Sequence, residues 1–310
     1  MHRSRLLRWA FFVFLTYAIL CVVIGVFVAE GTLHPQRRAL TPEAEASVRQ
    51  MTLRNGSNLE DISIVGQRNV VLQAWSIHPP PERNNGNAVI LLHGLGDNRI
   101  GMTGYAELLL RHGYSVLLPD ARAHGASGGE LATYGLLERD DIRRWFEWLV
   151  ADQHPRCIFG LGESMGAAQL LQALEAEPGF CAVAAESSFV DFQEIAYDRV
   201  GQFFHAGPGV GRTVLRPVVF TAFCYARWKY GLNMWQVSPE DAVAQTKVPV
   251  LLIHGQIDSN IPLRHSRRIH ARNPAAILWE VPNTDHCGAI STAPMEFEAR
   301  ITEWFQLKRP

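Results

Sequence analysis

The residue that most clearly could carry chemistry is a serine between two glycines. Ser164 lies in the pentapeptide Gly-Glu-Ser-Met-Gly at 162–166, after an apolar run at 157–161 and before a helix-like segment at 167–175. A serine hydroxyl is a weak nucleophile unless it is held exposed, beside a base, at the positive end of a helix. A turn sharp enough to do this crowds side chains against backbone, and the flanking glycines relieve that crowding. The pattern is typical of a nucleophile elbow with Ser164 as the nucleophile.

Such a nucleophile needs a base and an acid that orients the base, in the chain order serine, carboxylate, histidine. Asp258 follows the apolar segment 250–253, and His286 follows the apolar segment 277–281. Because the carboxyl ends of parallel strands meet at one edge of a sheet, we expect both beside Ser164. Asp285 is an alternative acid. Adjacent side chains in a loop rarely point at each other, so the sequence favours Asp258.

The reaction also needs donors for the oxyanion that forms on the attacked carbonyl. A glycine-flanked loop at 93–96 follows the apolar segment 88–92. We predict an oxyanion hole made of the backbone N–H groups of Leu95 and Met165.

Other polar residues near these strand ends receive structural interpretations. Glu163 is interpreted as a hydrogen-bonding partner of the elbow. The loops themselves are expected to be held by four residues: His93, Asp120, His124 and His254. No Cys/His spacing resembles a metal site, and the mechanism requires neither a metal nor an organic cofactor.

The elements that must position these residues are short apolar strands alternating with helices. This rhythm predicts an α/β fold with a mostly parallel central sheet covered on both faces. Strands are expected at 62–65, 70–77, 88–92, 114–118, 156–161, 180–185, 249–254 and 276–281. Helices are expected at 102–112, 136–150, 167–175, near residue 266 and at 294–307. An aromatic-rich insertion at about 189–245 breaks the rhythm and is predicted to be a helical lid over the carboxyl ends of the strands.

The amino terminus differs in kind from the rest of the chain. Residues 9–29 contain no charged side chain and, as a helix, reach roughly 30 Å, the thickness of a bilayer core. A cleaved signal peptide has a shorter apolar region and a small-x-small exit, so the sequence favours an uncleaved signal anchor. The expected organisation is a cytoplasmic tail at 1–8, the anchor at 9–29, a tether at 30–60 and a catalytic domain at 61–310.

Positive charge sets the expected orientation. Arg3, Arg5 and Arg8 precede the apolar stretch and place the amino terminus in the cytoplasm, with the catalytic domain on the periplasmic, lumenal or extracellular side. Arg37 and Arg38 follow the stretch and oppose this orientation.

Composition bounds the remaining possibilities. The chain has 310 residues, 47% of them hydrophobic, and a formal net charge of −1, which suits one large domain and gives no electrostatic footprint for nucleic acid. Cys157 and Cys181 begin two segments expected to be neighbouring strands. A disulfide between them is conceivable in an oxidising compartment, but the interpretation that we favour is buried free thiols.

From about residue 70 to residue 307 the chain resembles the α/β-hydrolase family, in its membrane-anchored lipase-, esterase- and thioesterase-like branch. The motifs that carry this resemblance are His93-Gly94, the segment 120–127, the elbow at Ser164, the block from His254 to Pro262, and His286. The family commonly has Arg-Gly-His-Gly where this chain has Arg-Ala-His-Gly at 122–125, which puts only the local turn in question. The resemblance implies hydrolysis of an ester, thioester or amide.

We therefore expect a membrane-anchored serine hydrolase that cleaves a carboxylic ester or thioester with a lipophilic acyl group. Its expected partners are a small-molecule or lipid-like acyl substrate and, through residues 9–29, a membrane. The alternatives are a serine peptidase or amidase, an acyltransferase, or a catalytically silent membrane-tethered binding module.

Overall fold

The computed structural model describes residues 2–206 and 208–307. Residue 1 of the predicted tail, residue 207 of the predicted lid and residues 308–310 of the predicted catalytic domain lie outside the described residues. The chain forms two compact units. The helical unit comprises Met1–His34 and Asp191–Gln236, and the sheet unit comprises Pro35–Val190 and Val237–Pro310.

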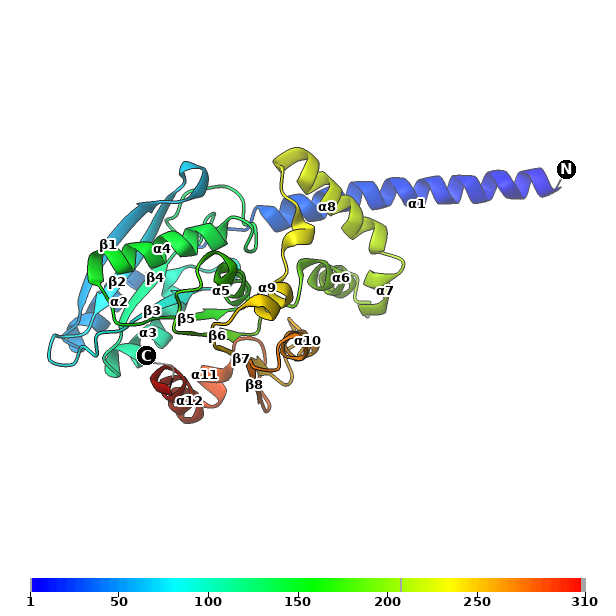
Figure 1. Cartoon of the computed structure of the whole chain (residues 1–310). Helices are drawn as coiled ribbons and strands as arrows, with labels where there is room; N and C mark the ends of the chain where they lie inside the picture. Colours follow the sequence, from blue (N-terminus) through cyan, green and yellow to red (C-terminus); the bar gives the residue numbers. More distant parts are fainter. Residues whose placement is uncertain (1, 207, 308–310) are drawn as a thin grey trace. The chain divides into compact units, whose positions relative to one another are not determined.

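The sheet unit is built on a mostly parallel β-sheet of eight strands (Figure 1). Their order across the sheet is β1-β2-β4-β3-β5-β6-β7-β8. Strand β2 pairs antiparallel with both β1 and β4, and all other pairs are parallel. The strands are β1 (Asn58–Val65), β2 (Val71–His78), β3 (Ala88–Leu92), β4 (Ser115–Pro119), β5 (Ile158–Glu163), β6 (Ala182–Glu186), β7 (Val250–Gly255) and β8 (Ile277–Val281). The predicted α/β fold with a mostly parallel sheet is confirmed.

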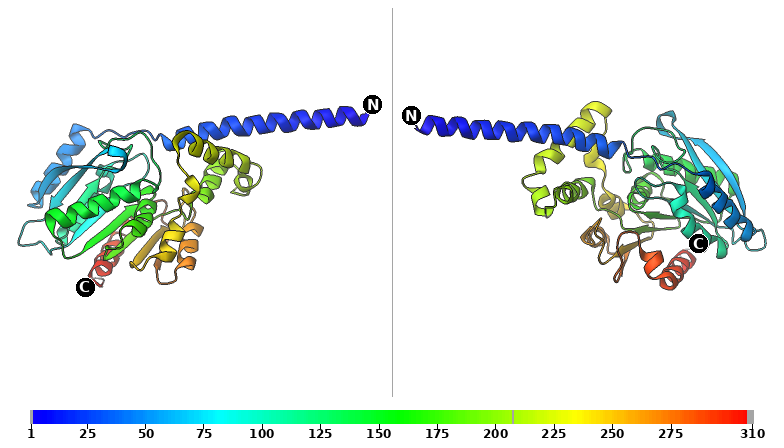
Figure 2. Two further views of the ribbon diagram at one scale, coloured as in Figure 1. Left: turned by 45° about the horizontal axis from the view of Figure 1, so that its top comes forward. Right: turned by 180° about the vertical axis from the view of Figure 1, so that it is seen from behind.

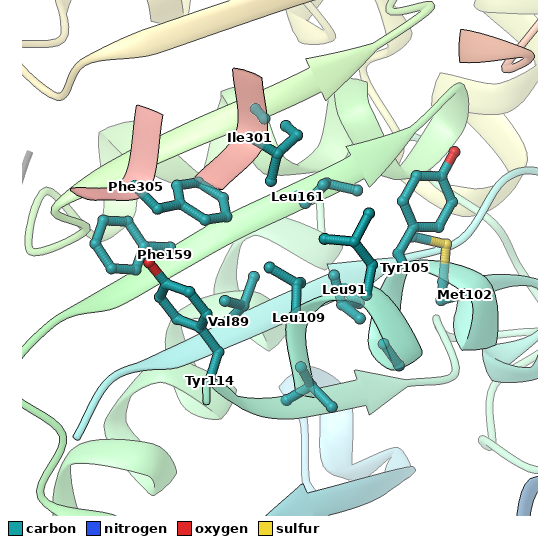
Figure 3. Close-up of a cluster of buried hydrophobic side chains, with 14 of the residues drawn as sticks. Val89, Leu91, Met102, Tyr105, Leu109, Tyr114, Phe159, Leu161, Ile301 and Phe305 are labelled. Atoms are coloured by element: carbon teal, nitrogen blue, oxygen red, sulfur yellow. The ribbon is translucent and has the colours of Figure 1, made fainter. Parts of the chain in front are cut away.

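Both faces of this sheet are covered because its central strands are apolar on both sides. Side chains of α3 (Thr103–Arg111) and α12 (Pro294–Leu307) pack on one face over Val89, Leu91, Phe159 and Leu161 (Figure 3). On the other face, α4 (Glu138–Gln153) and α5 (Met165–Ala176) pack over Ile90 and its neighbours. The remaining elements of this unit are α2 (Pro42–Arg54), η1 (Gln67–Asn69), η2 (Arg99–Met102), α9 (Pro239–Gln245), α10 (Arg264–Arg272) and α11 (Ala289–Thr292).

A disulfide joins the starts of two central strands. Cys157 and Cys181 are bonded, with their Cα atoms 5.8 Å apart. The amide of Cys181 donates to the carbonyl of Ile158 where β5 and β6 begin to pair. The preference for buried free thiols was therefore wrong. Register contributes to the outcome, because Phe159 pairs with Ala182 and the two cysteines therefore lie diagonally across the start of the strand pair, within bonding distance.

The predicted tether is largely part of the sheet unit. After α1 the chain contains α2, and β1 already begins at Asn58. The guanidinium of Arg37 donates to the carbonyls of Ser127 and Gly129, and Arg38 forms an ion pair of 2.8 Å with Asp97. These contacts fasten the chain to the loops after β4 and β3 within a few residues of the apolar helix.

The helical unit contains α1 (His2–Leu33), α6 (Phe192–Phe203), α7 (Pro208–Arg212), α8 (Arg216–Tyr230) and η3 (Met234–Gln236). Within it, α8 lies alongside the carboxyl-terminal half of α1 (Figures 1 and 2). Residues Arg3–Leu33 of α1 are long and apolar enough to cross a membrane, which is compatible with a single-pass anchor or a signal sequence. The insertion is helical as predicted; its role as a lid stays a prediction.

Candidate active site

Ser164 occupies a strained turn between β5 and α5. Its φ and ψ are 52° and −115°, a combination that L-residues rarely adopt. The flanking glycines make the turn possible. A Cβ on Gly162 would lie 2.6 Å from the Gly166 carbonyl oxygen, and one on Gly166 would lie 2.3 Å from the Leu92 carbonyl oxygen. Close backbone packing, which tolerates only glycine at positions 162 and 166, thus holds the serine above the edge of the sheet.

The structure brings Ser164, His286 and Asp258 together in one chain of hydrogen bonds. Nε2 of His286 lies 2.9 Å from Oγ of Ser164. Nδ1 of His286 lies 2.9 Å from Oδ2 and 3.1 Å from Oδ1 of Asp258. Because a carboxylate only accepts hydrogen bonds, Nδ1 carries the imidazole proton and Nε2 is left to accept the proton of the serine hydroxyl. This geometry fits general-base activation of a nucleophile.

Asp258 is held as a buried anion. Burial opposes its ionisation, but hydrogen bonds from His254, His286 and the Ile261 amide hold the pKa of this carboxyl well below its usual range. Its Oδ1 accepts from the amides of Asn260 and Ile261 at 2.9 and 2.7 Å. The carboxylate therefore keeps its charge and its orientation toward His286 at neutral pH.

The alternative acid, Asp285, is used within its own loop. Its Oδ1 accepts from the amides of Ser259 and His286, each at 2.8 Å. It thus fixes the backbone of the histidine loop, while the imidazole of His286 contacts Asp258.

The predicted oxyanion donors lie at the two expected places. Met165 is the first residue of α5, so its N–H has no acceptor within the helix. Leu95 lies in the turn after β3, and no acceptor for its N–H is found among residues 2–206 and 208–307. Gly94 brings this turn close to the nucleophile, since a Cβ there would lie 3.5 Å from Cβ of Ser164. Both amides are therefore free to bind an oxyanion, and that role stays a prediction.

A pair of glutamates stands beside the elbow. The parallel register places Glu163 opposite Glu186 at the ends of β5 and β6. The Tyr105 hydroxyl lies 3.3 Å from Glu163 and 3.1 Å from Glu186, and it points away from the apolar cluster that surrounds its ring (Figure 3). Burial and the charges of Glu186 and Asp97 raise the pKa of Glu163 to about 7, although hydrogen bonds from Tyr105 and the Gly94 amide oppose the shift. Glu163 thus links the elbow to the predicted oxyanion loop.

Reasoning from the sequence alone did not identify Glu186 as a site residue. Its backbone carbonyl accepts the Ser164 amide at 2.8 Å, and its carboxyl group accepts the Ala289 amide at 2.9 Å. It therefore joins the elbow to the loop that carries His286. A signal was present, since an acid ends an otherwise apolar strand at the same edge as the nucleophile.

The residues that were expected to hold the loops form hydrogen bonds or ion pairs with those loops. His93 donates from Nδ1 to the Gly94 carbonyl and accepts the Ala121 amide at Nε2, and burial lowers its pKa to about 4, so it stays neutral. Asp120 forms a buried ion pair with Arg99 at 2.7 Å. His124 contacts the Arg122 carbonyl at 2.9 Å.

His254 does more than the sequence suggested. Its Nε2 lies 2.8 Å from the Ile261 carbonyl and 3.3 Å from Oδ2 of Asp258. Because the carbonyl only accepts, Nε2 carries a proton that also faces the carboxylate. The signal in the sequence for this contact was the spacing of four residues between His254 and Asp258. In the part of the chain that the structure describes, no cluster of His, Cys, Asp and Glu side chains could hold a metal ion.

With this geometry in place, comparison with known proteins identifies the class. The model of the alpha/beta hydrolase family matches residues 89–300, more than half of the chain. The protein belongs to that family.

The curated relatives that it matches include two bacterial proteins. The chain is 31% identical over 206 residues to the uncharacterized protein YqkD of Bacillus subtilis, an alignment that covers 64% of this chain and 65% of that relative, just under two thirds of its length. It is 26% identical over 241 residues to the uncharacterized protein YfhR of Escherichia coli, covering 75% of each.

Solved structures share the fold. An esterase of Pyrococcus furiosus is similar with a TM-score of 0.68 and 24% identity over 90% of this chain and 99% of that one. An acylaminoacyl peptidase of Pyrococcus horikoshii is similar with a TM-score of 0.60 and 18% identity over 81% of this chain and 42% of that one. At these identities the likeness concerns the architecture.

Proposed function

We propose that this protein is a membrane-anchored serine hydrolase that cleaves a carboxylic ester or thioester. The observation that carries the proposal is the hydrogen-bonded chain from Ser164 through His286 to Asp258, beside the backbone amides of Leu95 and Met165. Membership of the alpha/beta hydrolase family supports hydrolysis.

The proposed mechanism has two half-reactions. Nε2 of His286 takes the proton of Ser164 as its Oγ bonds to the acyl carbon, and the amides of Leu95 and Met165 hold the resulting oxyanion. His286 then gives its proton to the departing alcohol or thiol, which leaves an acyl-serine. Water, activated by the same imidazole, attacks the acyl-serine, and the carboxylic acid departs as Ser164 regains its proton. Asp258 keeps the imidazole in the required tautomer throughout.

The substrate that we propose has a lipophilic acyl group. Two large apolar side chains are exposed on loops beside the site: Leu95, 48% exposed in the predicted oxyanion loop, and Ile257, 61% exposed immediately before Asp258. Exposed apolar side chains next to a polar reaction centre suit an acyl chain.

The proposed location is a membrane, with residues 9–29 as a single-pass anchor, the amino terminus in the cytoplasm and the catalytic domain on the far side. The disulfide between Cys157 and Cys181 supports this side, because disulfides persist in oxidising compartments and are rare in the cytosol.

Labelling with a fluorophosphonate, which reacts with activated serines, tests the central proposal. The full chain is expected to form one adduct, at Ser164, and Ser164→Ala should form none. Ser63→Ala, a serine on β1 far along the chain from the elbow, is the matched control and should label like the parent protein. An unlabelled parent, or an adduct that persists in Ser164→Ala, would favour the silent binding module.

Substrate class is tested by rates on matched ester, thioester and amide substrates with the same acyl group, with and without an alcohol acceptor. We expect the ester or thioester to react fastest, and esters of longer acyl chains to react faster than the acetate. An amide that reacts fastest would favour a peptidase, and acyl transfer to the alcohol in preference to water would favour an acyltransferase.

A further inference from the structure

Helix α8 carries an apolar stripe that faces outward. Pro217, Phe220, Cys224 and Trp228 are exposed and follow one another at intervals of three, four and four residues, so they lie on one side of the helix. Phe220 is 61% and Trp228 81% exposed. An exposed helix face that carries two large aromatic side chains and no charged residue among its four positions is a candidate interaction surface.

The same helix packs along α1 through specific contacts. The Tyr17 hydroxyl donates to the Val214 carbonyl just before α8. A Cβ on Gly25 would lie 2.7 Å from Cβ of Thr221, so the glycine permits close approach of the two helices. Glu30 then accepts hydrogen bonds from three side chains near the end of α8: Tyr225 at 2.6 Å, Lys229 at 2.8 Å and Tyr230 at 2.8 Å.

These contacts run in the same order along both helices, so α8 is parallel to α1 and pairs with its segment from Tyr17 to Glu30. At 1.5 Å per residue the paired segment is about 20 Å long. The 32 residues of α1 extend about 48 Å, roughly 18 Å more than the hydrocarbon core of a bilayer. With residues 9–29 as the proposed span, the surplus is divided between residues 2–8 and 30–33, and the segment that pairs with α8 forms the half of the span nearer the far leaflet. Helix α8 therefore lies beside that half of the span, with its carboxyl end at the outer boundary of any bilayer that α1 crosses.

The composition of α8 fits that boundary. Tyr225, Lys229 and Tyr230 gather at the level of Glu30, and aromatic and cationic side chains are enriched where a membrane meets water. Arg227 is exposed near this end of the helix, where it can meet lipid phosphates.

We propose that α8 is a second membrane-contacting element, whose stripe of Pro217, Phe220, Cys224 and Trp228 lies among the acyl chains of the far leaflet. Lipid is the occupant because the stripe belongs to the same unit as the exposed apolar side chains of α1, such as Val23 at 46% and Phe27 at 73% exposed. The inference rests on the proposed transmembrane role of α1. It assigns the insertion a bilayer-binding function that is separate from the reaction at Ser164.

A photoreactive lipid tests the contact directly. The full chain is reconstituted in vesicles of phosphatidylcholine with a diazirine in its acyl chain, irradiated and mapped by peptide mass spectrometry. Lipid adducts are expected on α1 and on residues 217–228, and none are expected on α4 of the sheet unit. The double variant Phe220→Ser/Trp228→Ser should lose most adducts on α8 and keep those on α1.

The outcomes separate the inference from the proposals on which it rests. Adducts on α1 without adducts on α8 would overturn the inference alone. No adducts on α1 would overturn the membrane anchor and the inference together. Neither result would bear on fluorophosphonate labelling of Ser164.

Cys224 provides a second measurement that uses a native residue. A charged, membrane-impermeant maleimide should label Cys224 in vesicles at least tenfold more slowly than Val150→Cys on α4, where the native side chain is 47% exposed. Both positions follow α1, so mixed orientation in the vesicles affects them equally.

Labelling of the two sites at equal rates would place α8 in water and overturn the proposal. Protection that vanishes at one copy per vesicle would show that a second copy covers the stripe, which also overturns it.

Discussion

Ser164 shows how a single residue depends on its backbone. Its φ of 52° is sterically unfavourable for a side-chain-bearing residue, and such strain persists only where surrounding structure enforces it. The enforcing contact is the approach of Gly166 to the Leu92 carbonyl, which joins the elbow to β3. Because β3 also leads into the loop of Leu95, the same contact brings the nucleophile and one predicted oxyanion donor to the same place.

The roles of the two neighbouring aspartates can be separated by amide substitution. Asp258→Asn should keep the fold but lower the turnover number by about 10⁴, as for the aspartate of other triads, because the amide favours the wrong imidazole tautomer. Steady-state kinetics on a soluble ester measures the effect.

Asp285→Asn is the matched control, because its carboxylate contacts backbone amides and the Ser259 hydroxyl. We expect a loss of less than tenfold. If Asp258→Asn lost less than tenfold and Asp285→Asn lost more, the acid role would move to Asp285.

Glu163 makes stability depend on pH. Its pKa is raised to about 7 in the fold, so the folded state binds this proton more tightly than the unfolded chain does. Below about pH 4.5 this carboxyl is neutral in both the folded and the unfolded state and does not lower the stability of the fold. As the pH rises from there through 7, the unfolded chain releases the proton before the folded state does, and the stability that the group contributes is lost. In Glu163→Gln this loss should be absent. The variant should therefore gain about 2 kcal/mol in unfolding free energy relative to the parent between pH 5 and pH 8.

Urea unfolding at the two pH values measures this difference. Glu107→Gln is the control, since Glu107 is exposed on α3. It should follow the parent protein at both values. A Glu163→Gln protein whose stability changes with pH as the parent's does would show that Glu163 is not the titrating group.

At the scale of elements, the disulfide ties two central strands across the β5-α5-β6 crossover. It closes a segment with a sequence separation of 24, so in the chain-entropy model it stabilises the fold by about 3 kcal/mol. The double variant Cys157→Ser/Cys181→Ser should melt roughly 5 to 10 °C lower than the oxidised parent, measured by calorimetry. Reductant should lower the parent's midpoint to the same value and leave the variant's unchanged. An equal midpoint for all samples would mean that the bond does not contribute to stability.

Strands and helices with strong local patterns could be predicted from the sequence. The segment 88–92 coincides with β3, and the helix at 294–307 coincides with α12. Both have uninterrupted apolar runs or helical spacing with clear boundaries. The contact of Ser164, His286 and Asp258 was also predictable, because chain order and strand ends sufficed to bring the three residues to one edge.

What could not be predicted depends on register and on contacts between distant segments. Whether Cys157 reaches Cys181 is decided by the alignment of β5 with β6, in which Phe159 pairs with Ala182. The contact of His254 with Asp258 requires the exact path of the loop between them. The pairing of α1 with α8 joins segments nearly 200 residues apart, and neither helix has a pattern that identifies the other.

At the scale of the whole molecule, the chain divides so that the apolar helix belongs to one unit and the reaction centre to the other. The segment between them is short, since α1 ends at Leu33 and Arg37 and Arg38 are already bound to loops of the sheet unit. If α1 spans a membrane, as proposed, the sheet unit that follows it lies on one side of that membrane. The side is then decided by the charges that flank the span.

The last prediction concerns that side. Arg3→Glu/Arg5→Glu/Arg8→Glu removes the positive charge before the span and leaves Arg37 and Arg38 after it, so a substantial fraction of molecules should insert in the opposite orientation. In these molecules the sheet unit lies in the reducing cytosol, where Cys157 and Cys181 stay as thiols. Thiol alkylation after rapid denaturation, followed by a gel shift, measures the reduced fraction. Reversal of three exposed cations far from the span, Arg54, Arg68 and Lys247, should leave the disulfide formed. A fully oxidised protein with the three amino-terminal arginines reversed would mean that these charges do not set the orientation.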